Sequence, residues 1–84
     1  MKLRLSLQAQ EDLDYWVSCD PELARRIRAL LERLEKGQDL PALQQVNLKF
    51  REISLTSVKI APEHRLVFEP SGEQILVHQC RFHY

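Results

Sequence analysis

The chain has little of what marks unusual classes of protein: its 84 residues hold two cysteines, two glycines and four prolines, with no excess of either charge. Two cysteines without a CxxC motif are too few for a disulfide framework, so we expect Cys19 and Cys80 to be reduced thiols. The low glycine and proline content excludes collagen-like and low-complexity chains. Twelve basic side chains balance twelve acidic ones, which excludes a whole-molecule attraction to nucleic acid or anionic lipid. An anionic ligand therefore requires a local cluster of cations.

Long apolar runs and metal-ligand spacings are also missing. No uncharged stretch approaches the ~18 to 20 residues of a membrane-spanning helix, and residues 1–4 alternate polar and apolar side chains instead of forming a signal-peptide core. The histidines at positions 64, 78 and 83 lack the spacing of a zinc site. We therefore expect a soluble, cytoplasmic protein without a metal or cofactor. Residues 1–84 should form a single domain, because a chain this short supports one hydrophobic core.

Hydrophobic periodicity predicts a strand followed by two helices. Polar and apolar residues alternate over residues 2–7, as in a half-buried strand. Helical spacing predicts a short helix near residues 8–18 and a second over residues 21–36, where Asp20 provides an N-cap and Gly37 a stop. The short connection between them favours an antiparallel helical hairpin packed on a sheet.

The apolar positions of these helices form the expected core. They are Ala9, Leu13, Trp16 and Val17 in the first helix and Leu23, Ala24, Ile27, Leu30, Leu31 and Leu34 in the second. Tyr15 is also interpreted as a core residue. The acidic residues of the first helix, Glu11, Asp12 and Asp14, are expected to face water.

Alternation returns at Leu48 and continues toward the end of the chain, interrupted by turn-forming residues at 62–63 and 70–73. This pattern predicts three or four consecutive antiparallel strands. Residues 38–47 contain a proline and adjacent glutamines and favour a loop, with one helical turn as an alternative. The predicted fold is α+β: an N-terminal strand and a two-helix hairpin packed on a mainly antiparallel sheet of four to five strands. The other sheet face and the loop before Leu48 are left for a ligand.

Basic residues concentrate in the strand half of the chain, at Lys49, Arg51, Lys59, Arg65 and Arg81. If several of them share a sheet face, they form a local phosphate-binding patch. The alternative is a set of ordinary strand-face charges. The arginines of the second helix alternate with its core positions, so we interpret them as a solvated face paired with nearby glutamates.

The last four residues, 81–84, combine a cation, two aromatic rings and an imidazole, which is unusual for a chain end. An imidazole can transfer a proton near neutral pH, and a terminal tyrosine can stack on a base. A core or partner-contact role for His83 and Tyr84 is the alternative. His64 and His78 have no identifiable partner in the sequence.

Two stretches carry a resemblance to a known family. Residues 63–68, Glu-His-Arg-Leu-Val-Phe, followed by residues 80–84, Cys-Arg-Phe-His-Tyr, resemble the YoeB/Txe branch of the RelE/ParE toxin superfamily. The resemblance covers the whole chain and is strongest after residue 57. It implies a RelE-like fold and a bacterial toxin that cuts translated mRNA in the ribosomal A site and is held inactive by an antitoxin. The implied partners are this antitoxin, the ribosome and mRNA, and the branch is often dimeric.

The resemblance also implies roles for individual residues. Metal-independent cleavage by a ribose 2′-OH needs a base, a cation at the phosphate and an acid for the leaving 5′-oxygen. Arg65 matches the family's phosphate-stabilising arginine, His83 its general acid and Tyr84 its RNA-contacting tyrosine. Lys49 matches a lysine of the family's site, and Lys59 stands where the branch usually has arginine.

One position departs from the family. The general base of the family is a glutamate, where this sequence has Val46, and a shift of one or two residues finds only amide side chains. Candidate replacements for the base are Glu52, Glu63 and Lys49. The alternative is a catalytically weak or silent module that binds its antitoxin or the ribosome. A gyrase-directed toxin on the same fold is disfavoured, because that branch lacks the terminal His-Tyr.

Overall fold

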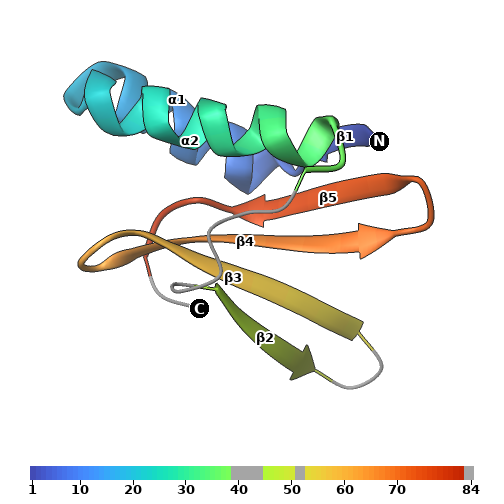
Figure 1. Cartoon of the computed structure of the whole chain (residues 1–84). Coiled ribbons are helices and arrows are strands. Elements are labelled where there is room, and N and C mark those ends of the chain that lie inside the picture. The colour runs from blue at the N-terminus through green and yellow to red at the C-terminus, as the bar shows by residue number, and fades with distance from the viewer. Residues whose placement is uncertain (39–44, 51–52, 83–84) are drawn as a thin grey trace.

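The structure is a computed structural model that describes residues 1–38, 45–50 and 53–82, with the backbone alone at residues 45–50 and 53. A strand and two helices come first, and four further strands follow (Figure 1). In chain order the elements are β1 (Lys2–Leu5), α1 (Leu7–Cys19), α2 (Pro21–Glu35), β2 (Gln45–Phe50), β3 (Ile53–Ala61), β4 (His64–Ser71) and β5 (Gln74–Gln79).

The strands form one mixed sheet in the order β1-β5-β4-β3-β2. β1 pairs in parallel with β5, and the other neighbouring strands pair antiparallel. Both helices lie over one face of this sheet (Figure 1). The predicted fold class, a helical hairpin on a mainly antiparallel sheet, is therefore confirmed.

The starts of both helices follow from capping side chains. Ser6 Oγ accepts a hydrogen bond from the Ala9 amide at 3.0 Å, so the chain turns into α1 at Leu7. The prediction that the first strand extends to Leu7 is therefore wrong, and this side chain is exposed. Asp20 caps α2 by accepting from the Leu23 amide at 3.2 Å, as its position before a proline predicts.

The core lies between the helices and the sheet, and it contains nearly all the predicted helical positions. Leu30 is partly buried, and the sheet contributes Val58, Ile60, Leu66, Phe68, Ile75 and Val77. Each of the large aliphatic side chains contributes roughly 1.5 to 3 kcal/mol through burial. Three predictions for α1 are wrong: Tyr15 and Val17 are 41% and 42% exposed, whereas Asp12 is 2% exposed.

β2 begins earlier than the sequence predicts. Residues 45–47 pair with Val58, Ser57 and Thr56 of β3, so the predicted loop over residues 38–47 is too long at its C-terminal end. The rest of that loop, residues 39–44, lies outside the described residues. β2 is an edge strand, and edge strands accept the polar residues that made this segment resemble a loop.

Candidate active site

Arg65 lies in β4 on the sheet face opposite the helices. Its chain neighbours His64 and Leu66 contact the helical side, so strand alternation directs Arg65 the other way. There Arg65 Nε donates a hydrogen bond to Ser57 Oγ, and Nη2 donates to the Ser57 carbonyl oxygen at 3.1 Å. Ser57 is 1% exposed. Two contacts to one buried residue fix the orientation of the planar guanidinium.

Lys59 is the cross-strand partner of Arg65. Opposite residues of an antiparallel pair project from the same face, with Cβ atoms ~4.5 to 5.5 Å apart. Lys59 is exposed and Arg65 is half-buried. The structure therefore brings these two predicted site cations together on the face that the helices leave open.

The register of β2 places two further predicted positions relative to this pair. Val46 is directly opposite Ser57, and Lys49 is opposite Ser54. Because Ser54 is three residues from Ser57, the register position of Lys49 is about 10 Å along the strand from the Arg65 anchor and, by strand alternation, on the other sheet face. Position 46, where the resemblance expects a glutamate, is thus the register neighbour of the residue that holds Arg65.

Two side chains of α1 form hydrogen bonds with the backbone just after β5. The Cys80 N–H donates to Asp12 Oδ2 at 3.1 Å, and the Cys80 carbonyl accepts from Trp16 Nε1 at 2.8 Å. Gln8 Nε2 donates to the other oxygen of Asp12 at 2.7 Å. Asp12 is therefore a buried carboxylate with both oxygens bonded, which offsets the cost of its burial.

Phe82 is held two residues further on. Its N–H donates to His64 Nδ1 at 2.8 Å, and its carbonyl accepts from the Arg65 N–H at 3.1 Å. Phe82 has a φ of 67°, a left-handed conformation that is uncommon outside glycine. These contacts connect Phe82 to β4 at His64 and at Arg65, whose side chain is bonded to Ser57.

Arg81 stacks on aromatic rings. Its guanidinium carbon lies 3.6 Å from the centroid of the Tyr15 ring and 4.5 Å from that of the Phe82 ring. Its buried Nε has no hydrogen-bond partner in the part of the chain that the structure describes. The stacking explains why Tyr15 is outside the core: its ring forms a platform for Arg81.

Of the remaining predicted site residues, the structure describes Glu63 alone. Glu63 is exposed in the turn between β3 and β4, two residues before Arg65. The others lie outside the described residues: Arg51, Glu52, His83 and Tyr84.

Both histidines that lacked an identifiable partner in the sequence have one. His78 Nε2 lies 3.0 Å from Glu69 Oε1, as a half-buried pair. His64 bonds Phe82 and meets the Trp16 ring edge-on, with centroids 4.7 Å apart. Sequence reasoning therefore missed four residues that shape this region: Asp12, Trp16, Ser57 and His64.

The thiol of Cys80 is not a nucleophile near neutral pH. Burial and the nearby negative charge of Asp12 raise the pKa of its thiol from an ordinary value of 9.0 to about 12. Nucleophilic cysteines need the thiolate form. Cys80 is therefore a packing residue, whereas Cys19 is exposed.

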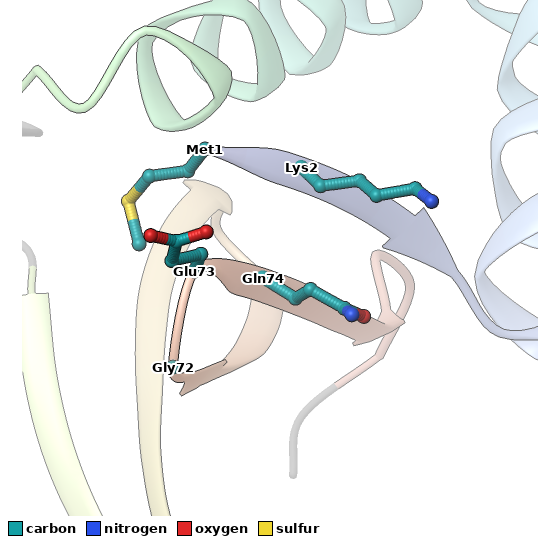
Figure 2. Close-up of a pocket in the computed structure, with 5 residues that line it drawn as sticks. All are labelled: Met1, Lys2, Gly72, Glu73 and Gln74. Carbon is teal, nitrogen blue, oxygen red and sulfur yellow. The ribbon is translucent and has the colours of Figure 1, made fainter.

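The described residues contain no metal site, and a surface hollow lies away from Arg65. No three His, Cys, Asp or Glu side chains within residues 1–38, 45–50 and 53–82 gather to hold a metal ion. A hollow of about 500 Å³ between β1 and the β4–β5 turn is lined by Met1, Lys2, Gly72, Glu73 and Gln74 (Figure 2). It lies at the opposite end of β4 from Arg65. Neither described helix is long and apolar enough to cross a membrane.

Comparison with known proteins identifies the family. A family model of YoeB-like toxins of bacterial type II toxin–antitoxin systems matches residues 5–84. Toxin YoeB of Escherichia coli K12 is 30% identical over 88 residues, covering 100% of both chains. The YoeB dimer from Staphylococcus aureus has a TM-score of 0.82 at 28% identity, covering 100% of this chain and 98% of that one.

A heterotetrameric YoeB–YefM toxin–antitoxin complex, also from Staphylococcus aureus, matches with a TM-score of 0.79 at 28% identity and the same coverage. The family model and the Escherichia coli relative span nearly the whole chain, and the two solved structures share its fold. The chain therefore belongs to the YoeB-like toxins of bacterial type II toxin–antitoxin systems.

Proposed function

We propose that this toxin is a ribosome-dependent endoribonuclease that cuts mRNA without a metal ion. The observation that carries the proposal is the double attachment of Arg65: its side chain is held by Ser57, and its N–H binds the Phe82 carbonyl at 3.1 Å. Position 83 is one peptide bond beyond Phe82. Arg65 therefore bonds directly to the residue that precedes His83, the histidine assigned as the acid.

The proposed reaction is attack of a ribose 2′-OH on the neighbouring phosphorus. A base takes the 2′-OH proton, a new P–O2′ bond forms and the P–O5′ bond breaks. His83 gives a proton to the leaving 5′-oxygen, so the products are a 2′,3′-cyclic phosphate and a free 5′-OH. Arg65 stabilises the charge that develops on the phosphate oxygens, and Tyr84 contacts the RNA.

Four cations are proposed to bind the substrate strand: Lys49, Arg51, Lys59 and Arg81. Lys59 is the one best supported, because it is exposed and is the cross-strand partner of Arg65. Each phosphate contact adds a favourable, salt-sensitive contribution to RNA binding.

Position 46 is a valine, so another residue must act as the base that takes the 2′-OH proton. Glu63 is exposed in the turn two residues before Arg65, and Glu52 and Lys49 remain further candidates. A general base typically contributes ~10² to 10⁴-fold, so a poorly placed replacement lowers the rate without abolishing cleavage.

A second candidate function is a catalytically silent module that binds its antitoxin or the ribosome. The observation that favours it is the position of Val46 directly opposite Ser57, where a valine cannot accept a proton.

We also propose the partners and the cellular setting. A YoeB–YefM complex is known for a relative in Staphylococcus aureus, and another solved structure of that organism's toxin is a dimer. By analogy we propose a cognate antitoxin and a homodimer for this chain, with the ribosome and mRNA as targets in the cytoplasm. An acidic antitoxin segment would complement Lys59 and Arg65.

Cleavage of mRNA on programmed ribosomes tests this function. We expect Arg65→Ala and His83→Ala each to reduce the cleavage rate by about 10² to 10⁴-fold. Arg26→Ala, which removes an exposed arginine from α2, is the control and should cut like the wild type. Wild-type rates in both site variants would refute the site, and a folded wild type that cuts nothing would favour the silent module.

A further inference from the structure

The end of the chain is bound at two successive points by side chains that take no part in the proposed chemistry. The first point is Cys80, whose two polar backbone atoms both bond to α1. Its N–H donates to Asp12 Oδ2 at 3.1 Å, and its carbonyl accepts from Trp16 Nε1 at 2.8 Å. Chain ends are usually poorly ordered unless such contacts tie them down.

The second point is Phe82. Its N–H donates to His64 Nδ1 at 2.8 Å, so this nitrogen carries no proton and the ring acts as an acceptor. Phe82 also has a φ of 67°, a backbone conformation that persists only where the surroundings impose it. The His64 contact and the Arg65 N–H on the Phe82 carbonyl hold the backbone on both sides of this residue.

The two points form one assembly. The Trp16 ring, which bonds the Cys80 carbonyl, lies against the His64 ring with centroids 4.7 Å apart. Asp12 and Trp16 are one helical turn apart in α1 and are both buried. Asp12, Trp16 and His64, called the clamp below, therefore connect a rigid helix to the backbone on both sides of Arg81.

We propose that the clamp is a set of positioning residues for the RNA-cleaving centre: by fixing the backbone at Cys80 and Phe82, it sets where the following histidine is delivered relative to Arg65. This inference rests on the proposed function. Its physical basis is that a displacement of about 1 Å at a reacting group can cost ~10²-fold in rate, even when the chemistry is unchanged.

His64 allows the sharpest test, because its ring and its acceptor atom can be separated. His64→Phe keeps an aromatic ring beside Trp16 and removes the acceptor. His64→Asn loses the ring but places its Oδ1 three bonds from Cα, as histidine places Nδ1. His78→Phe is the control. It makes the same His-to-Phe substitution at another half-buried histidine, whose ring bonds Glu69 and not Phe82.

Two measurements are made on each variant: cleavage kinetics on mRNA-programmed ribosomes and NMR hydrogen exchange at the Phe82 amide. We expect His64→Phe to lower kcat by about 10- to 100-fold with KM within about twofold of wild type. The Phe82 amide should exchange about tenfold faster or more. His64→Asn should restore most of the kcat and most of the protection of the Phe82 amide. His78→Phe should match the wild type in kcat and in exchange rate.

The outcomes separate this inference from the proposed function. Wild-type exchange at Phe82 in His64→Phe, faster exchange with an unchanged kcat, or a His64→Asn variant as impaired as His64→Phe would each overturn the positioning role. A wild-type protein that cuts no RNA would overturn the proposed function. The exchange rates would still decide whether His64 holds the chain end.

Discussion

Cys80 and Asp12 are both buried in this toxin, and they are joined by a hydrogen bond from the Cys80 N–H to the Asp12 carboxylate. Burial, with a smaller contribution from the negative charge of Asp12, raises the pKa of the Cys80 thiol to about 12. A thiol with a raised pKa keeps its proton in the folded state over a pH range in which the unfolded chain has lost it. The contribution of Cys80 to stability is therefore tied to pH.

The sign of this dependence is fixed by the direction of the shift. The stabilisation is fully present below the ordinary thiol pKa of 9.0 and is lost as the pH rises toward about 12. We expect the urea midpoint of the wild type to fall more steeply over this window than that of Cys80→Ala. Equal slopes in the two proteins would contradict the burial of this thiol.

Val46 is the residue at which this toxin departs from the glutamate that the family resemblance implies. Its register position opposite Ser57 is next to the anchor of Arg65. We expect Val46→Glu to raise the cleavage rate on ribosomes by about 10²-fold or more, because it supplies a proton acceptor. Phe50→Glu, on the same edge strand but opposite Ile53, is the control. No gain in Val46→Glu would mean that another residue already acts as the base.

At the level of elements, the site depends on the pairing of β3 with β4. Ser57 in β3 holds two nitrogens of Arg65 in β4, one through its hydroxyl and one through its backbone carbonyl. Ser57→Ala removes the hydroxyl contact and keeps the carbonyl contact. We expect the cleavage rate to fall by about tenfold, because a hydrogen bond to a charged group contributes a net ~1.5 kcal/mol.

A matched control comes from the same strand. Ser54→Ala changes an exposed serine three residues away, and it should leave both cleavage and thermal stability unchanged. Equal activity of Ser57→Ala and wild type would show that Arg65 acts without help from the Ser57 hydroxyl.

The helices and most strands could be predicted because their signals are local. The α2 core positions follow one helical stripe, and Asp20-Pro21 marks its start. Asp12 also lies on the apolar stripe of α1, between Ala9 and Leu13, but its residue type predicts a side chain that faces water. The spacing was the better guide.

The contacts that shape the chain end could not be predicted in the same way. Asp12 and Cys80 are 68 residues apart in the sequence, and His64 and Phe82 are 18 apart. Such contacts depend on the sheet order, in which β5 lies between β1 and β4. The family resemblance supplied Arg65 as a site residue, but its anchor Ser57 carries no sequence signal of its own.

For the whole molecule, the balance of twelve basic and twelve acidic residues limits how it finds RNA. Lys59 and Arg65 are a local pair on one sheet face, and two cations give little long-range attraction to a phosphate backbone. We therefore expect free RNA to bind weakly, and under the proposed function the ribosome presents the strand to be cut.

The most direct test of the central claim is cleavage of ribosome-bound mRNA that carries a single 2′-deoxyribose at the scissile position. The account predicts that the all-ribose message is cut to a 2′,3′-cyclic phosphate and a 5′-OH, and that the deoxy message stays intact. Cleavage of both messages, or of neither by the folded toxin, would contradict it.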